Sequence, residues 1–127
     1  MYYFAYGTNI NKKIFLKRFK QSKYLRKYIL KKHKVIFRSK SGLPDIKKDK
    51  KSSAKGIIYK IDSVIEKKID KYEDYPNLYK KKYFMLKNKK IMYYIMKKKS
   101  YLSNPSNYYL KIIKSGYKQN NYKFNLY

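Results

Sequence analysis

The sequence predicts an α+β protein, with a compact mixed β-sheet or partial barrel and a few short helices. Three observations favour this class. Strand-like and helix-like segments alternate irregularly, two strand-like segments follow one another late in the chain, and 127 residues suit a single domain over residues 1–127. The late pair of strands argues against a wound sheet in which a helix follows every strand.

The first expected elements are a strand, a tight loop and a helix. Residues Tyr2 to Tyr6 are aromatic and apolar, as is typical of a buried strand, and Gly7 to Asn9 should end it in a turn. Asn11 is a suitable N-cap for the helix that follows. The apolar face of that helix would consist of Ile14, Phe15 and Phe19.

The middle of the chain predicts two strands separated by a long loop, followed by a helix. Residues Val35 to Phe37 form a short strand pattern, and Gly56 to Ile61 form another. Between them, Ser39 to Lys55 is polar and lysine-rich, so we expect a mobile loop. Ser63 to Glu66 has the spacing of a capping box, and apolar residues at helical spacing predict a helix over 64–72.

A proline ends that helix, and a hairpin follows. Pro76 disfavours helical geometry in the residue before it, so the helix should end within Glu73 to Pro76. Residues Tyr79 to Lys87 and Ile91 to Met96 are strand-like, and Asn88 to Lys90 between them suits a hairpin connection.

A last helix is expected near the C-terminal end of the chain. Asn104 is a candidate cap with Pro105 at the first helical position, and Gly116 is a candidate stop. The residues after Gln119 give no pattern that assigns them to an element. The apolar face of this helix would consist of Tyr109, Ile112 and Ile113.

The composition excludes several kinds of site and leaves the origin of the charge open. The chain has no cysteine and one histidine, which excludes thiolate chemistry and Cys or His metal clusters, so we expect no metal and no cofactor. No apolar run approaches a membrane span, and the N-terminus lacks a signal-peptide pattern, so we expect a cytoplasmic protein. The net charge of +28 attracts anions of every kind, yet AT-rich coding across a whole proteome would produce it too.

Two segments carry residues suited to chemistry. In Tyr6 to Asn9, a glycine at the end of a strand lets backbone N–H groups approach a carboxylate, although an ordinary turn has the same pattern. Glu73 lies at the end of an amphipathic helix beside tyrosines, where burial and the helix dipole would raise its pKa. A solvated carboxylate facing the many lysines is the alternative interpretation.

Six segments follow one another over nearly the whole chain: Tyr3 to Ile10, Gly42 to Ile46, Lys55 to Tyr59, Ile69 to Tyr75 with Tyr79 downstream, Tyr94 to Met96, and Asn104 to Gly116. Together they resemble the gamma-glutamylcyclotransferase superfamily, which includes the AIG2-like proteins. The first and fifth are quite specific and the others are weak singly. Against the family pattern, Thr8 replaces Ser, Asp74 replaces Gly, and Pro44 and Asp45 replace Ala and Ser or Thr.

The resemblance implies the family's fold and an enzyme that cyclises a gamma-glutamyl group and releases 5-oxoproline. In that reaction the α-amine of the substrate is the nucleophile, and Glu73 would serve as base and then as acid. The expected partner is a small gamma-glutamyl amino acid, peptide such as glutathione, or amine. The substrate-binding residues implied are Tyr3, Phe4, Ala5, Tyr6, Gly7, Thr8, Asn9, Tyr79, Tyr94 and Met96.

Other functions stay open at this point. The departures at Asp74, Pro44 and Asp45 leave room for a binding or regulatory protein of the same fold. Basic residues interleaved with tyrosines suit single-stranded nucleic acid, but no recognised nucleic-acid-binding signature is present, so nucleic acid is not expected as the primary partner. The sequence does not indicate the oligomeric state.

Overall fold

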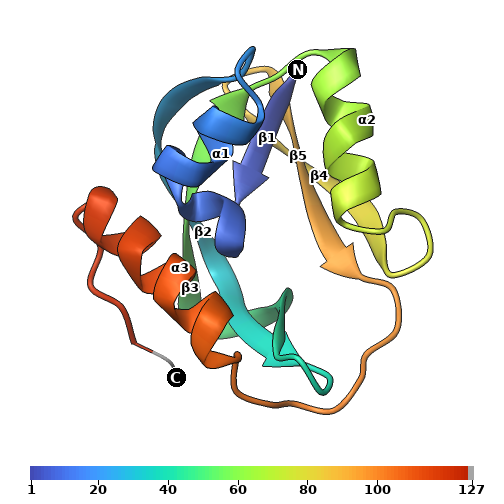
Figure 1. Cartoon of the computed structure of the whole chain (residues 1–127), viewed down its shortest axis with the longest axis vertical. Coiled ribbons are helices and arrows are strands. Elements are labelled where there is room, and N and C mark those ends of the chain that lie inside the picture. Colours follow the sequence, from blue (N-terminus) through green and yellow to red (C-terminus); the bar gives the residue numbers. More distant parts are fainter. Residues whose placement is uncertain (126–127) are drawn as a thin grey trace.

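The computed structural model describes residues 1–125 and contains one mixed sheet with helices on one side (Figure 1). Its helical elements are the 3₁₀ turn η1 (Thr8–Ile10), α1 (Lys12–Arg18), α2 (Ser63–Tyr72) and α3 (Asn107–Gln119). Its strands are β1 (Tyr2–Ala5), β2 (Lys23–Arg38), β3 (Leu43–Lys60), β4 (Tyr79–Leu86) and β5 (Lys89–Met96).

The sheet has the strand order β2-β3-β1-β5-β4. The short strand β1 lies at its centre, antiparallel to β3 and parallel to β5, so that Tyr3 pairs with both Tyr59 and Met92. Two antiparallel hairpins, β2–β3 and β4–β5, form the two sides. A mixed sheet with helices between and after its strands confirms the predicted α+β class.

The sheet has a hydrophobic core on each face. On one face the three helices cover β1, β3 and β5: Phe15 of α1, Ile69 of α2 and Ile113 of α3 are fully buried there with Tyr59. The second core consists of strand residues alone and is centred on Phe4, around which the long β2–β3 hairpin bends. Register shifts in β2, one of them at Lys32 with its positive φ, permit this bend.

The largest difference from expectation is the β2–β3 hairpin. The predicted strand Val35 to Phe37 is only the end of β2, and the loop predicted over Ser39 to Lys55 is wrong, because Leu43 onward belongs to β3. Each strand satisfies the backbone hydrogen bonds of the other, while many of the lysine side chains lie in solvent. A polar composition is therefore compatible with a strand when the pairing comes from a distant segment.

The predicted helices are present, but three of their ends differ. Asp62, not Ser63, caps α2, and its side chain accepts a hydrogen bond from the Ile65 N–H at 2.8 Å. Ser106 caps α3 in place of Asn104. Gly116 lies inside α3 and does not end it.

The remaining local predictions are mostly confirmed. Asn11 caps α1 through a side-chain bond to the Ile14 N–H, although Ile14 itself is exposed and not part of the apolar face. The predicted hairpin is present, but its connection is the two-residue turn Lys87 and Asn88 and not Asn88 to Lys90, because Lys89 and Lys90 already belong to β5. Both turn residues have positive φ, which matches the twist of a hairpin. Within the described residues, no helix combines the length and the apolar composition that crossing a bilayer requires.

Candidate active site

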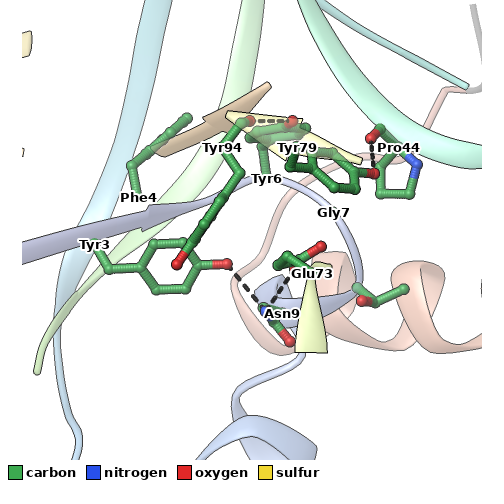
Figure 2. A pocket seen from close by; sticks show the side chains of 10 residues that line it. Tyr3, Phe4, Tyr6, Gly7, Asn9, Pro44, Glu73, Tyr79 and Tyr94 are labelled. Carbon is green, nitrogen blue, oxygen red and sulfur yellow. Dashed lines mark hydrogen bonds between the residues drawn. The ribbon is translucent and has the colours of Figure 1, made fainter. Parts of the chain in front are cut away.

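A small pocket opens where β1 ends and the chain turns into η1 (Figure 2). Because β1 is short, the longer strands β3 and β5 continue past it on either side. The end of α2 and the start of β4 complete the walls. The lining residues are Tyr3, Phe4, Tyr6, Gly7, Thr8, Asn9, Pro44, Glu73, Tyr79 and Tyr94.

Gly7 permits a close approach between the η1 loop and β3. A Cβ atom built on Gly7 would lie 2.6 Å from Pro44 Cγ, so a side chain there would collide with the proline ring. After Gly7 the chain enters η1, whose first amides lack intrahelical partners. Among residues 1–125, the N–H groups of Thr8 and Asn9 make no hydrogen bond, and they are free to bind an anionic group at this wall.

Glu73 is the C-cap of α2, and the helix end fixes its position. Its N–H donates to the Ile69 carbonyl at 2.8 Å. The next residue, Asp74, has φ of +52°, a left-handed conformation in which glycine is most readily accommodated. Asp tolerates this region better than most residues do, so the turn forms with Asp74 where the family pattern has Gly.

The Glu73 carboxylate has few polar partners. Asn9 Nδ2 donates to Glu73 Oε1 at a long 3.4 Å and to the Tyr3 hydroxyl at 3.0 Å, and Figure 2 shows the three side chains converging. Burial raises the pKa of Glu73 to about 7, because the charged form is poorly solvated there. A carboxyl group with this pKa exchanges a proton readily near neutral pH.

No lysine or arginine lines this pocket, although the chain has 35 of them. Glu73 is the one formally charged side chain in the lining. The pocket therefore offers a carboxylate to a cationic group of a ligand, and only backbone N–H groups, hydroxyls and the Asn9 amide to an anionic one.

The tyrosine hydroxyls around the pocket already have partners. Tyr6 donates to the Tyr94 carbonyl, and Tyr79 donates to the Pro44 carbonyl at 2.5 Å. Tyr94 donates to Asp70, and burial, together with this hydrogen bond, holds the pKa of Tyr94 well above its usual value. In this arrangement the hydroxyl hydrogens of Tyr6, Tyr79 and Tyr94 point to the protein, while the Tyr3 hydroxyl accepts a hydrogen bond from Asn9.

Asp70 connects the pocket wall to an ion-pair network outside it. Lys81 of β4 lies 2.8 Å from Glu66 Oε2 and 3.0 Å from Asp70, so one lysine balances two carboxylates of α2. The same lysine lies over the Tyr75 ring at 4.3 Å. This network holds α2 against β4 and places Glu73, one turn after Asp70, at the pocket.

The structure brings together most of the residues implied by the resemblance. Ala5 is buried in the core and does not line the pocket, and Met96 lies outside it, where its N–H donates to Asp45. Pro44 lines the pocket but was not among the expected residues. Pro44 belongs to the segment Gly42 to Ile46, one of the six that resemble the family, and that membership is the sequence signal that could have identified it.

A model of the family described as gamma-glutamyl cyclotransferase, AIG2-like, matches residues 3–117. The chain belongs to this family. The match runs from the first pocket residue, Tyr3, through all of the lining to the interior of α3. Membership supports a gamma-glutamyl cyclotransferase-like function in general terms. No curated protein matches the sequence.

Solved structures share the fold at low identity. A human protein described as uncharacterized superposes with a TM-score of 0.80 at 22% identity, covering 94% of this chain and 79% of its own. A protein named gamma-glutamyl cyclotransferase gives 0.79 at 21% identity with the same coverage. A mouse AIG2-like protein gives 0.60 at 17% identity, covering 86% of this chain and 81% of its own. At these identities the likeness shows the gamma-glutamyl cyclotransferase fold.

Proposed function

We propose that this protein cyclises the gamma-glutamyl group of a small amino acid, peptide or amine conjugate and releases 5-oxoproline. The observation that carries the proposal is Glu73, a carboxylate with a pKa of about 7 in a pocket that has no basic side chain. Such a group accepts a proton from an ammonium and returns it to a leaving nitrogen.

The first step frees the nucleophile. The α-ammonium of the substrate gives a proton to the Glu73 carboxylate, and the resulting amine attacks the γ-carbonyl carbon to form the ring C–N bond. The electron pair of the carbonyl moves onto its oxygen. The pocket holds amine and carbonyl together, which lowers the entropic barrier to ring closure.

The second step expels the leaving group. The nitrogen of the former amide takes the proton held by Glu73, and the C–N bond to it breaks as the carbonyl re-forms. The ring nitrogen loses its surplus proton through the same carboxylate, and the released amine leaves as an ammonium ion. Thr8 and Asn9 supply free N–H groups for the transient oxyanion or for the substrate carboxylate.

The pocket has to widen to accept this substrate. Its cavity volume is about 20 Å³, room for a single water molecule and not for a glutamyl group. Pro44 and Tyr79, joined by one hydrogen bond, form the wall opposite Glu73 that would move. A non-catalytic binding or regulatory protein of the same fold is the second candidate, and it is favoured by Pro44, whose ring lies against Gly7 where the family pattern has Ala.

The test is 5-oxoproline release from gamma-glutamyl amino acids, glutathione and gamma-glutamylamines by the wild type, Glu73→Gln and Asp74→Asn. We expect Glu73→Gln to lower kcat by about 10²–10⁴-fold, the usual contribution of a general acid–base group. Asp74→Asn removes the adjacent charge and keeps a residue that tolerates positive φ, so it should retain activity.

The dependence of the wild-type rate on pH gives a second readout. Since Glu73 has to be ionised to take the first proton, kcat/KM should rise with pH through about 7. Turnover by Glu73→Gln equal to wild type would remove Glu73 from the mechanism. Absence of release from every substrate would instead favour the binding role.

A further inference from the structure

A second hollow lies on the other face of the sheet from Glu73. Successive side chains of a strand point to opposite faces, so Tyr94 of β5 faces the Glu73 pocket while Tyr93 and Ile95 face this groove. The groove forms between β3 and β5 beyond the last residue of β1, where no strand separates them. Its cavity volume is 390 Å³, far larger than that of the Glu73 pocket.

The groove has an apolar base and cationic sides. Ile46, Tyr93 and Ile95 form the apolar part, and Met96 borders it at the end of β5. The basic residues converge from β2, β3, β4 and the segment after β5, which are separate in sequence. They are His33, Arg38, Lys47, Lys48, Lys82 and Lys99.

The one acid in the lining does not neutralise these cations. Asp45 is buried, and its two oxygens are used by Arg38 Nε and by the Met96 N–H, each at 2.8 Å. Arg38 also donates to the Ser100 carbonyl at 2.7 Å, which fixes its guanidinium group. Within residues 1–125, Lys48, Lys82 and Lys99 form no ion pair.

Lys47 differs from these three lysines. Asp49 accepts a hydrogen bond from the Lys51 N–H, which is the largest cause of its lowered pKa. The nearby charge of Lys47 lowers the Asp49 pKa further. Lys48, Lys82 and Lys99 are therefore the cations around the groove that most lack a counter-charge.

We propose that this groove binds a small molecule that carries a di- or triphosphate on an apolar or aromatic body. Several lysines that surround one hollow repel one another, and a polyanion placed among them relieves that repulsion. The apolar base gives the body of the ligand a surface to cover. The volume falls in the range of small-molecule sites, about 300–1,000 Å³.

The phosphate groups of nucleic acid share this chemistry, but the shape of the site favours a small ligand. The basic residues that line the groove come from separate segments of the chain and surround one hollow, which suits a compact ligand better than an extended strand. The general charge of +28 attracts any polyanion, so the test has to separate a local site from the overall field.

The experiment measures ADP binding by isothermal titration calorimetry in about 150 mM NaCl, where surface charges are screened beyond about 8 Å. The groove variant is Lys48→Gln, Lys82→Gln and Lys99→Gln together. The control variant removes the same charge from α1 and α3 by Lys13→Gln, Lys17→Gln and Lys111→Gln, all exposed positions. Adenosine, pyrophosphate and a single-stranded oligonucleotide are the comparison probes.

We expect one ADP per chain, weakened tenfold or more in the groove variant and less than threefold in the control. Adenosine should bind far more weakly, and pyrophosphate should fall between the two. Glu73→Gln should bind ADP as the wild type does, so this result is independent of the proposed reaction.

Three results would overturn the proposal. They are absence of ADP binding at this salt concentration, equal weakening in the groove and control variants, and oligonucleotide binding that exceeds ADP binding and drops equally in both variants. Each would assign the attraction to the overall charge and not to the groove. Circular dichroism of both triple variants excludes misfolding as the cause of a loss.

Discussion

Glu73 differs from the other acidic residues in the partners available to it. Asp45 is paired with Arg38, and Glu66 and Asp70 share Lys81. Among residues 1–125, the Glu73 carboxylate has only a long hydrogen bond from Asn9, and burial accounts for its raised pKa. The property that suits it to proton transfer is therefore one that costs the fold free energy whenever the group is ionised.

This cost predicts a pH-dependent effect of Glu73→Gln on stability. The folded-state pKa of about 7 exceeds the ordinary pKa of 4.5 for a glutamate, so the folded protein binds more protons than the unfolded chain between these values. Stability therefore falls as pH rises through this window, by at most about 3 kcal/mol. Because Gln does not ionise, Glu73→Gln should be more stable than wild type at pH 8 and similar at pH 4.

Urea denaturation at the two pH values measures this difference in the free energy of unfolding. Asp74→Asn, a change at the neighbouring acid, is the control and should show no such divergence. A constant difference between Glu73→Gln and wild type across the range would contradict the raised pKa.

Pro44 is a second single residue with a large effect on the site, because its ring limits the width of the pocket. Its ring lies above Gly7, and the family pattern has Ala at this place. We expect Pro44→Ala to raise kcat/KM several-fold, mainly through a lower KM, while the backbone carbonyl keeps its bond from Tyr79. Steady-state kinetics checks this expectation, with Pro105→Ala outside the pocket as control. A lower kcat/KM would show that Pro44 supports the bound substrate.

At the scale of elements, α3 depends on close contact with the η1 loop. A Cβ on Gly116 would lie 2.7 Å from Ile10 Cγ2 and 2.8 Å from the Asn11 nitrogen. The Gln119 side chain also accepts a hydrogen bond from the Lys12 N–H at 2.8 Å and donates one to the Asn11 side chain. The helix thus supports η1, whose residues Thr8 and Asn9 line the Glu73 pocket. This close contact explains why a glycine lies inside a helix.

We expect Gly116→Ala to destabilise the protein by about 1–3 kcal/mol, the usual cost of overpacking a tight contact. Helix propensity alone predicts the opposite sign, a gain of about 1 kcal/mol. Urea denaturation decides between them, and Ser115→Ala, an exposed neighbour on α3, is the control. A stabilised Gly116→Ala would mean that the helix moves away from η1 at little cost.

At the scale of the whole molecule, the positive charge is spread over the surface while the acids serve local purposes. Asp62 caps α2, Asp45 holds Arg38, and Glu66 and Asp70 hold Lys81. Few acids are left to balance the lysines, so the folded state carries strong self-repulsion.

That residues 1–127 form a single domain stays a prediction.

This repulsion predicts a melting temperature that rises with salt. Between about 10 mM and 300 mM NaCl the Debye length falls from about 30 Å to below 8 Å, which screens most lysine–lysine repulsion. Calorimetry should show the increase, and the Lys13→Gln, Lys17→Gln, Lys111→Gln variant should show a smaller one. A melting temperature independent of salt would mean that the lysines are spaced too widely to interact.

The sequence by itself determined the elements with strong local patterns. The aromatic strand before Gly7, the helix ending at Glu73 and the late hairpin each follow from periodicity and turn residues within a few positions. The resemblance to the family then predicted that residues Tyr3 to Asn9 and Glu73 belong to one site, and the structure places residues from both segments in one pocket. Such patterns are readable because short-range sterics and capping act on neighbours in the chain.

Only the tertiary structure decided the features that depend on distant partners. The lysine-rich half of β3 is a strand because β2 supplies its hydrogen bonds, and Gly116 continues a helix because η1 lies against it. Pro44 narrows the pocket through the fold of that same hairpin, and the groove on the opposite face exists because β1 ends early. Backbone pairing and close packing across the sheet leave no periodic signal in sequence, so these features follow from the fold and not from local pattern.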